Sequence, residues 1–139
     1  MCCIFAAHFY LLNTMPFIKQ ANPFVVPTTD GKLIEEHVGL ATTGEKTHSI
    51  AHMVAPAGWS EPFQQPSFDE YTLVSRGRKQ FEVDGETVTV EAGQSILVKA
   101  GSRVRYSNPF KEECEYWSIC IPAFSMESVH RENEQFFLM

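Results

Sequence analysis

The sequence has little positive charge, and what it has is not clustered. Its 139 residues include 11 lysines and arginines against 17 aspartates and glutamates, so the net charge at neutral pH is −6. An acidic chain repels nucleic acid and anionic lipid headgroups. We therefore expect neither nucleic acid nor a membrane among the partners of this protein.

Paired cysteines are also lacking. The sequence has four cysteines and no C-x-x-C pair, which excludes zinc ribbons and thioredoxin-like redox chemistry. Cys114 and Cys120 fall on one predicted strand, where six residues of extended chain separate them by roughly 20 Å, too far for a disulfide. This cysteine usage is typical of free thiols in a reducing compartment, and we expect a cytoplasmic protein.

The first 18 residues have no charged side chain. They lack the positive start and the small-residue cleavage site of a signal peptide, and the apolar run is short for a membrane span. Met15 begins a stretch that reads like a natural protein start. We expect residues 1–14 to be a flexible extension or a misassigned start, and residues 15–139 to form a single domain.

Glycine and proline recur at short intervals after residue 23, and no long amphipathic helical repeat is present. Short runs of β-forming residues between such turn signals are typical of a β-sandwich or barrel. Ser125 is a predicted N-cap for one short helix that begins at Met126. The predicted strands cover residues 25–26, 32–42, 47–55, 70–76, 94–99, 103–107 and 114–121, with a hairpin over residues 81–90.

The hairpin is the clearest of these elements. Asp84 and Gly85 supply the two positive-φ positions of a type I′ turn. In that register Phe81 pairs with Val88 on an apolar face, and Glu82 pairs with Thr87 on a polar face.

Two sets of residues around this hairpin have the spacing of the two cupin motifs. The first set is Gly58, Glu70 and Gly77, and the second is Gly93, Gly101 and Asn108. The chain therefore resembles the cupin superfamily, and in particular small single-domain cupins whose metal-binding motifs have degenerated. The resemblance implies an all-β fold, a cupin-type double-stranded β-helix (jelly-roll) barrel with a short C-terminal helix, and it implies a homodimer.

The metal ligands that the resemblance would imply are mostly missing. Gln64, Pro66 and Val104 stand where the motifs have histidines, and only Glu70 matches a ligand position. Proline and valine cannot bind a metal, and an amide oxygen is a poor ligand for a transition metal. We therefore expect no metal cofactor.

A non-standard metal site is an alternative. His48 and His52 lie four residues apart in a predicted strand and so share a face, and His52 could approach Glu70 and Gln64 if that face is inward. A surface or hydrogen-bonded histidine is the favoured interpretation of His52.

The polar residues expected in the pocket are Gln64, Glu70 and Tyr106. From its place in the motif, Glu70 should point into the barrel, where a carboxyl group can act as general acid or base or can be a structural group held by hydrogen-bond donors. Tyr106 shares a strand face with Val104, so it could donate a hydrogen bond to a ligand or fill the space of the missing metal.

Both tryptophans and a short basic run complete the candidates. Trp59, in a loop at the expected mouth of the barrel, could flank a ligand or lie at a dimer interface. Trp117 alternates with Ile119 and Ile121, which favours core packing. Arg76, Arg78 and Lys79 are interpreted as a solvated surface.

Three functions are compatible with these residues. The first is binding of a small molecule in a metal-free pocket by Gln64, Glu70, Tyr106, His52 and Trp59. The second is a metal-independent isomerase, lyase or hydrolase, with Glu70 as acid or base and Tyr106 as its catalytic partner. The third is metal binding by the set His52, Glu70 and Gln64.

Overall fold

The structure is a computed structural model that describes residues 15–132. Regular structure in this part is almost entirely β, as expected. The strands are β1 (Phe24–Val25), β2 (Leu33–Val38), β3 (Ser49–Ala55), β4 (Asp69–Arg76), β5 (Arg78–Val83), β6 (Glu86–Glu91), β7 (Ser95–Val98), β8 (Val104–Ser107) and β9 (Cys114–Ile121), followed by the short helix α2 (Met126–Val129). The predictions for residues 1–14 fall outside the described residues.

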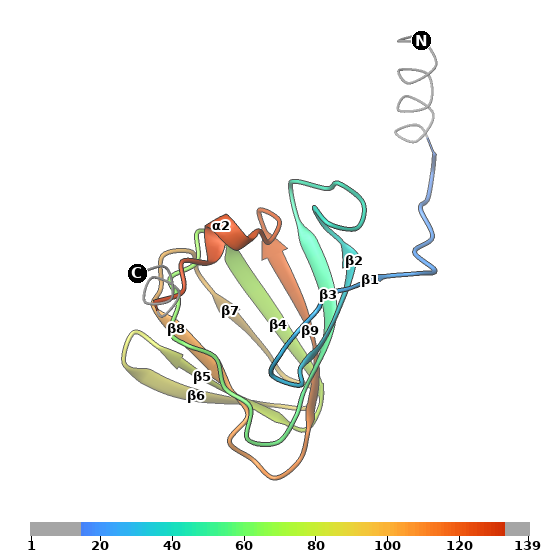
Figure 1. The fold of residues 1–139 in the computed structure, drawn as a ribbon. Helices are drawn as coiled ribbons and strands as arrows, with labels where there is room; N and C mark the ends of the chain where they lie inside the picture. The colour runs from blue at the N-terminus through green and yellow to red at the C-terminus, as the bar shows by residue number, and fades with distance from the viewer. Residues whose placement is uncertain (1–14, 133–139) are drawn as a thin grey trace.

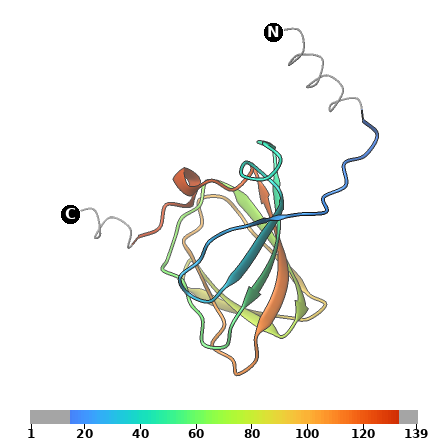
Figure 2. The same ribbon diagram turned by 45° about the vertical axis from the view of Figure 1, so that its right-hand side comes forward.

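Two antiparallel sheets make the barrel (Figure 1). The larger has the strand order β1-β2-β3-β9-β4-β7, and the smaller has the order β6-β5-β8. The turned view shows that the two sheets enclose a common interior, with α2 at one end of it (Figure 2). The predicted all-β barrel with a short C-terminal helix is confirmed. The described residues contain no helix that is long and apolar enough to cross a membrane.

The strand boundaries follow the turn chemistry. Asp84 (φ 47°) and Gly85 (φ 88°) both have positive φ, and the β5–β6 register pairs Phe81 with Val88 as predicted. The apolar face of the hairpin is only partly buried, because Phe81 is fully buried whereas Val88 is 37% exposed. The strand predicted over residues 32–42 is shorter and ends at Val38, because the amides of Thr43 and Gly44 bond back to the Gly39 carbonyl.

Gly77 lies where the chain leaves β4 in the larger sheet for β5 in the smaller sheet. Its φ of 76° is in the left-handed region, and a Cβ atom at this position would lie 2.5 Å from the backbone oxygen of Glu113. Both constraints require glycine. This motif residue therefore has a structural role that does not depend on a metal.

Asn108 has a similar role at a corner of the barrel. Its side chain is fully buried, and its amide donates hydrogen bonds to the backbone oxygens of Ala55, Pro56 and Glu112. A buried amide with these partners fixes three chain segments together.

The apolar core has two parts. The larger cluster includes Trp59, Phe81, Tyr106 and Tyr116, and the smaller one consists of residues near α2, namely Phe68, Cys120 and Val129. Between the two clusters the barrel interior contains a cavity, which is lined by members of both.

The prediction for Trp117 is wrong. Cys114, Tyr116, Ser118 and Cys120 are the buried residues of β9, whereas Trp117 and Ile121 are exposed on the outer face of the larger sheet. Alternation along a strand separates two faces but does not say which face is inward. Here the smaller and more polar set of side chains points into the barrel.

Candidate functional site

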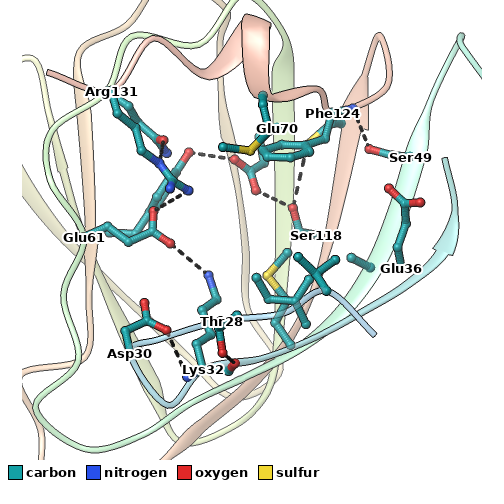
Figure 3. A pocket seen from close by; sticks show the side chains of 18 of the residues that line it. Thr28, Asp30, Lys32, Glu36, Ser49, Glu61, Glu70, Ser118, Phe124 and Arg131 are labelled. Atoms are coloured by element: carbon teal, nitrogen blue, oxygen red, sulfur yellow. Dashed lines mark hydrogen bonds and ion pairs between the residues drawn. The ribbon is translucent and has the colours of Figure 1, made fainter. Parts of the chain in front are cut away.

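A cavity of about 460 Å³ opens into the barrel between the two sheets (Figure 3). One part of its wall is apolar and includes Ile34, Met53, Phe68 and Phe124. The rest is polar and charged, which is unusual for the interior of a small barrel. Its charged lining residues are Asp30, Glu36, Glu61 and Glu70 on the acidic side, and Lys32, Lys79 and Arg131 on the basic side.

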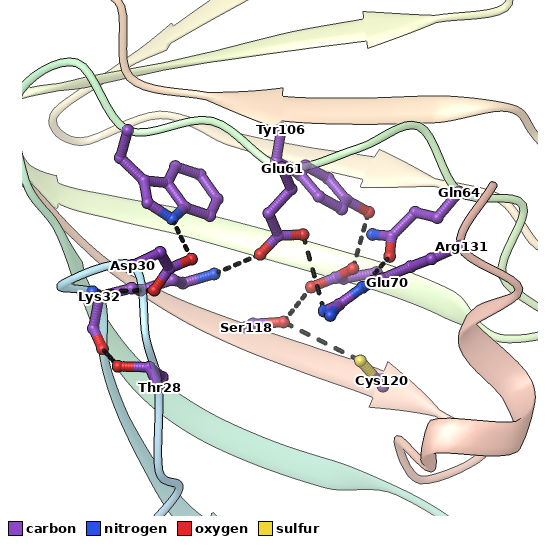
Figure 4. A network of polar contacts seen from close by, with 11 residues as sticks. Thr28, Asp30, Lys32, Glu61, Gln64, Glu70, Tyr106, Ser118, Cys120 and Arg131 are labelled. Atoms are coloured by element: carbon purple, nitrogen blue, oxygen red, sulfur yellow. Dashed lines mark hydrogen bonds and ion pairs between the residues drawn. The ribbon is translucent and has the colours of Figure 1, made fainter. Parts of the chain in front are cut away.

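Glu70 occupies the polar wall and is held by two hydroxyl groups (Figure 4). The Tyr106 hydroxyl donates to Oε1 at 2.7 Å, and the Ser118 hydroxyl donates to Oε2. Glu70 lies on β4, Tyr106 on β8 and Ser118 on β9, so this cluster joins the two sheets. Burial and the Glu70 carboxylate raise the pKa of Tyr106 well above its usual value, so Tyr106 keeps its proton and remains a donor.

Glu61 is the centre of a second polar cluster. It accepts from the Lys32 ammonium at 3.2 Å, and an Arg131 nitrogen lies 3.9 Å from its other oxygen. Arg131 also donates from Nε to the Gln64 side-chain oxygen at 3.5 Å. Burial alone would lower the pKa of Lys32, but Tyr116 and Glu61 outweigh it and raise that pKa, so Lys32 stays charged. The cluster brings together the residue that precedes β2, the loop between β3 and β4 and the segment after α2 (Figure 4).

Lys79 is the largest departure from the sequence interpretation, which placed it on a solvated surface. It lies on β5 with its side chain inside the barrel and is only 2% exposed. Its ammonium nitrogen lies 3.6 Å from the ring centre of Tyr116, 4.6 Å from that of Tyr106 and 5.0 Å from that of Phe81. Burial, aided by the charge of Lys32, lowers the pKa of Lys79 to about 7.

Gln64, Glu70 and Tyr106 are brought together as predicted. All three are buried and line the cavity. Trp59 is also buried rather than exposed in a loop, and its indole nitrogen donates to Asp30 at 2.7 Å while Lys32 lies over its ring. It therefore stands behind Asp30 and Lys32, which line the cavity, and does not line it directly.

His52 is not part of this site. The residues that β3 contributes to the cavity are Ser49, Ala51 and Met53, so His52 alternates to the outer face of the larger sheet. There its two ring nitrogens lie 2.8 Å from carboxylate oxygens of Glu35 and Glu115. The prediction that His52 lines the pocket is not supported, and the set of His52, Glu70 and Gln64 does not come together.

The remaining positions do not fit the metal that the cupin motifs normally hold. Within residues 15–132, no group of three or more histidine, cysteine, aspartate or glutamate side chains is arranged to hold a metal ion. Val104 is fully buried and apolar, and both oxygens of Glu70 already accept from hydroxyl groups. The chemical groups that this site offers to a ligand are therefore its own side chains.

Sequence reasoning missed Lys32, Glu61, Lys79, Ser118 and Arg131. Lys79 had a usable signal, because it alternates with Phe81 and Val83 on one strand face. The others come from distant segments, and no short spacing relates them.

Comparison with known proteins agrees with this fold. The family model of the cupin domain matches residues 51–122, and the chain belongs to the cupin family. The sequence is 47% identical over 109 residues to a protein of Myxococcus xanthus named Endoribonuclease YbeY. That match covers 78% of this chain but 37% of the relative, so the chain spans little more than a third of that protein.

Solved structures are similar at the level of the fold. Oxalate decarboxylase from Bacillus subtilis superposes with a TM-score of 0.71 at 13% identity, over 86% of this chain and 32% of that one. KdgF from Halomonas sp. gives a TM-score of 0.66 at 12% identity, over 81% and 97%. A putative ethanolamine utilization protein from Salmonella typhimurium gives 0.57 at 18% identity, over 67% and 71%.

Proposed function

We propose that this cupin binds a small organic molecule inside its barrel, with Gln64, Glu70 and Tyr106 as contact residues. The observation that carries the proposal is the cavity of about 460 Å³, whose wall contains buried charged groups. Small-molecule sites typically occupy roughly 300–1,000 Å³ and combine apolar walls with a few placed polar groups. This cavity has both.

The cost of the polar wall supports the same conclusion. Charged groups are expensive to bury even when they are paired, and apolar residues of similar volume often give an equally stable or more stable core. Lys32 and Glu61 have side chains only 6% and 11% exposed, and Lys79 is almost fully buried. Groups that do not favour folding are expected where binding needs them.

A screen of thermal stability tests this function. Protein would be heated with a library of uncharged and charged metabolites, and a true ligand should raise the midpoint with rising concentration. Glu70→Gln should reduce that shift, whereas Tyr71→Phe, on the exposed outer face, should leave it unchanged. Native mass spectrometry of protein purified without additives would identify a retained ligand. A ligand that stabilises wild type and Glu70→Gln equally would contradict the proposed site.

A second candidate is a metal-independent enzyme that transfers protons. It is favoured by the 2.7 Å hydrogen bond between Tyr106 and Glu70, which places a protonated phenol and a carboxylate side by side at the cavity. Once a substrate is known, Glu70→Gln should abolish turnover, while Ser118→Ala should reduce it less. If Glu70→Gln retains full turnover, this candidate is wrong.

A further inference from the structure

Lys79 has an environment that differs from that of the other two cations of the cavity. Lys32 and Arg131 both approach Glu61. Among the described residues, no carboxylate oxygen lies within 4.0 Å of the Lys79 nitrogen, the distance that defines an ion pair. Three aromatic rings surround the nitrogen, and the residue lines the cavity. The Lys79 amine therefore has ring contacts but, among the described residues, no direct ion pair that would hold it in the charged form.

Charged and titratable groups on several neighbouring segments affect the pKa of Lys79. Burial has the largest effect and lowers the pKa of Lys79, and Lys32, which precedes β2, lowers it further. Glu70 on β4, Glu61 in a loop and Cys114 on β9 raise it. The phenols of Tyr106 and Tyr116 keep their protons, because burial raises the pKa of each. At neutral pH the Lys79 amine is therefore uncharged far more often than the amine of an exposed lysine.

We propose that the Lys79 amine is a nucleophile that forms an imine with the carbonyl group of a small hydroxylated aldehyde or ketone in the cavity. The inference rests on the proposed binding of a small molecule there, and it names the class of that molecule. Lysine becomes nucleophilic when it is desolvated or lies beside another cation, and Lys79 meets both conditions.

The chemistry balances without an added oxidant or metal. The nitrogen lone pair adds to the carbonyl carbon, and the π pair of the carbonyl moves to oxygen. A proton passes from nitrogen to that oxygen, which gives a carbinolamine. Loss of one water forms the carbon–nitrogen double bond, so that amine and carbonyl compound give imine and water.

The rest of the wall indicates the kind of carbonyl compound. The cavity is lined by four carboxylate residues against three cationic ones, and two of those three cations already approach Glu61. The excess of carboxylates in the wall would repel a carboxylate group on the ligand. Hydroxyl groups can donate to carboxylates and accept from Gln64, which favours a neutral polyhydroxy compound over a keto acid.

Reductive alkylation of the wild-type protein tests the proposal. Protein at pH 7 would be treated with glycolaldehyde and sodium cyanoborohydride, which delivers hydride to the iminium carbon and leaves a stable secondary amine. Peptide mapping would then compare Lys79 with four exposed lysines, Lys19, Lys46, Lys99 and Lys111. We expect Lys79 to react at least about tenfold faster than each of these, given its larger uncharged fraction. A rate at Lys79 equal to or below theirs overturns the proposal.

The pH profile and a second probe sharpen the test. The rate at exposed lysines should rise about tenfold per pH unit from pH 7 to pH 9, while the rate at Lys79 should level off. With pyruvate, the rate at Lys79 divided by that at the exposed lysines should be lower than with glycolaldehyde. A higher ratio would overturn the assignment to neutral hydroxylated compounds.

Failure of the imine and failure of binding give different results. Without reductant, glycolaldehyde should stabilise wild type more than ethylene glycol does, and Lys79→Arg should remove that difference. If library ligands stabilise the protein while Lys79 resists alkylation, the imine proposal fails and the binding site stands. Because peptide mapping uses the wild-type chain, the test does not depend on how well Lys79→Arg folds.

Discussion

Each face of the larger sheet departs in part from the usual distribution of polar and apolar residues. Its inner face carries Glu36, Glu70 and Ser118, all of them buried. Its outer face carries exposed apolar residues, Leu33, Tyr71, Leu73, Leu97, Trp117 and Ile121. Folding alone favours the opposite arrangement. We infer that each face is organised for something that binds it: a small molecule inside, and a second copy of the chain outside.

The outer face suits a second copy because its apolar residues are neighbours in the strand register. Ile119 on β9 pairs with Tyr71 on β4, which pairs with Leu97 on β7, and Trp117 pairs with Leu73 one row along. A continuous apolar patch on a sheet can face its own copy across a two-fold axis, so that apolar rows meet apolar rows. The homodimer is therefore our proposal for this face.

The largest expected effect comes from breaking a buried ion pair. Lys32→Met leaves Glu61 without its closest cation, and the loss of one partner of a buried pair costs about 3–5 kcal/mol of unfolding free energy. Urea denaturation would measure the loss. The double variant Lys32→Met with Glu61→Leu removes the unpaired charge and should recover most of it. A single variant as stable as wild type would contradict the pairing.

The next effect concerns the donor to Glu70. Tyr106→Phe removes one of the two hydroxyl donors to a buried carboxylate, at an expected cost of about 1–3 kcal/mol in unfolding free energy. Tyr71→Phe makes the same chemical change on the outer face, where the side chain is 41% exposed, and should change stability by less than about 0.5 kcal/mol. Equal losses in the two variants would remove the distinction between the faces.

A smaller effect is expected from His52 and depends on pH. Burial lowers the pKa of His52, but hydrogen bonds to Glu35 and Glu115 outweigh it, so the pKa in the folded state is raised. The stabilisation is therefore complete below the unfolded value of about 6.5 and is lost as pH rises through the higher folded value.

Denaturation of His52→Gln beside wild type over this pH range would measure that contribution. The difference in unfolding free energy should fall with rising pH and should not exceed about 1 kcal/mol, the usual range for ion pairs near the surface. A difference that grows with pH would contradict the raised pKa.

The smallest effect on folding is expected on the outer face itself. Leu73 is 44% exposed, so Leu73→Ser should change the stability of dilute monomer by less than about 0.5 kcal/mol. The same change should weaken the proposed dimer, which light scattering after size exclusion would detect as a shift toward monomer. A wild-type chain that stays monomeric at every concentration would rule out the dimer.

The frame of the protein could be predicted because local chemistry determines it. Asp84 and Gly85 fix the hairpin register through their positive φ, and Ser125 caps α2 as expected by accepting from the Ser128 amide. Gly77 and Asn108 have structural roles at motif positions. Each of these features depends on the local conformation of one or a few residues, and the residue type at those positions is enough to predict it.

The site was predictable only in part, because it depends on which strand faces point inward. Gln64, Glu70 and Tyr106 were placed correctly through the motif spacing and strand alternation. Lys79 and Trp117 were assigned to the wrong side, since residue type argued for a solvated lysine and a buried tryptophan. Lys32, Glu61 and Arg131 meet through tertiary structure from three separate segments, and no local pattern relates them.

The positions of the two tryptophans give the molecule a separate optical reporter on each side of its wall. Trp59 is 4% exposed and touches Asp30 and Lys32 at the cavity, whereas Trp117 is 36% exposed and lies 5.1 Å from the rings of both His37 and His52. Because the sequence has only these two tryptophans, Trp117→Phe leaves an emission that responds to occupancy of the barrel. Trp59→Phe leaves one that responds to the outer face and to protonation of His52.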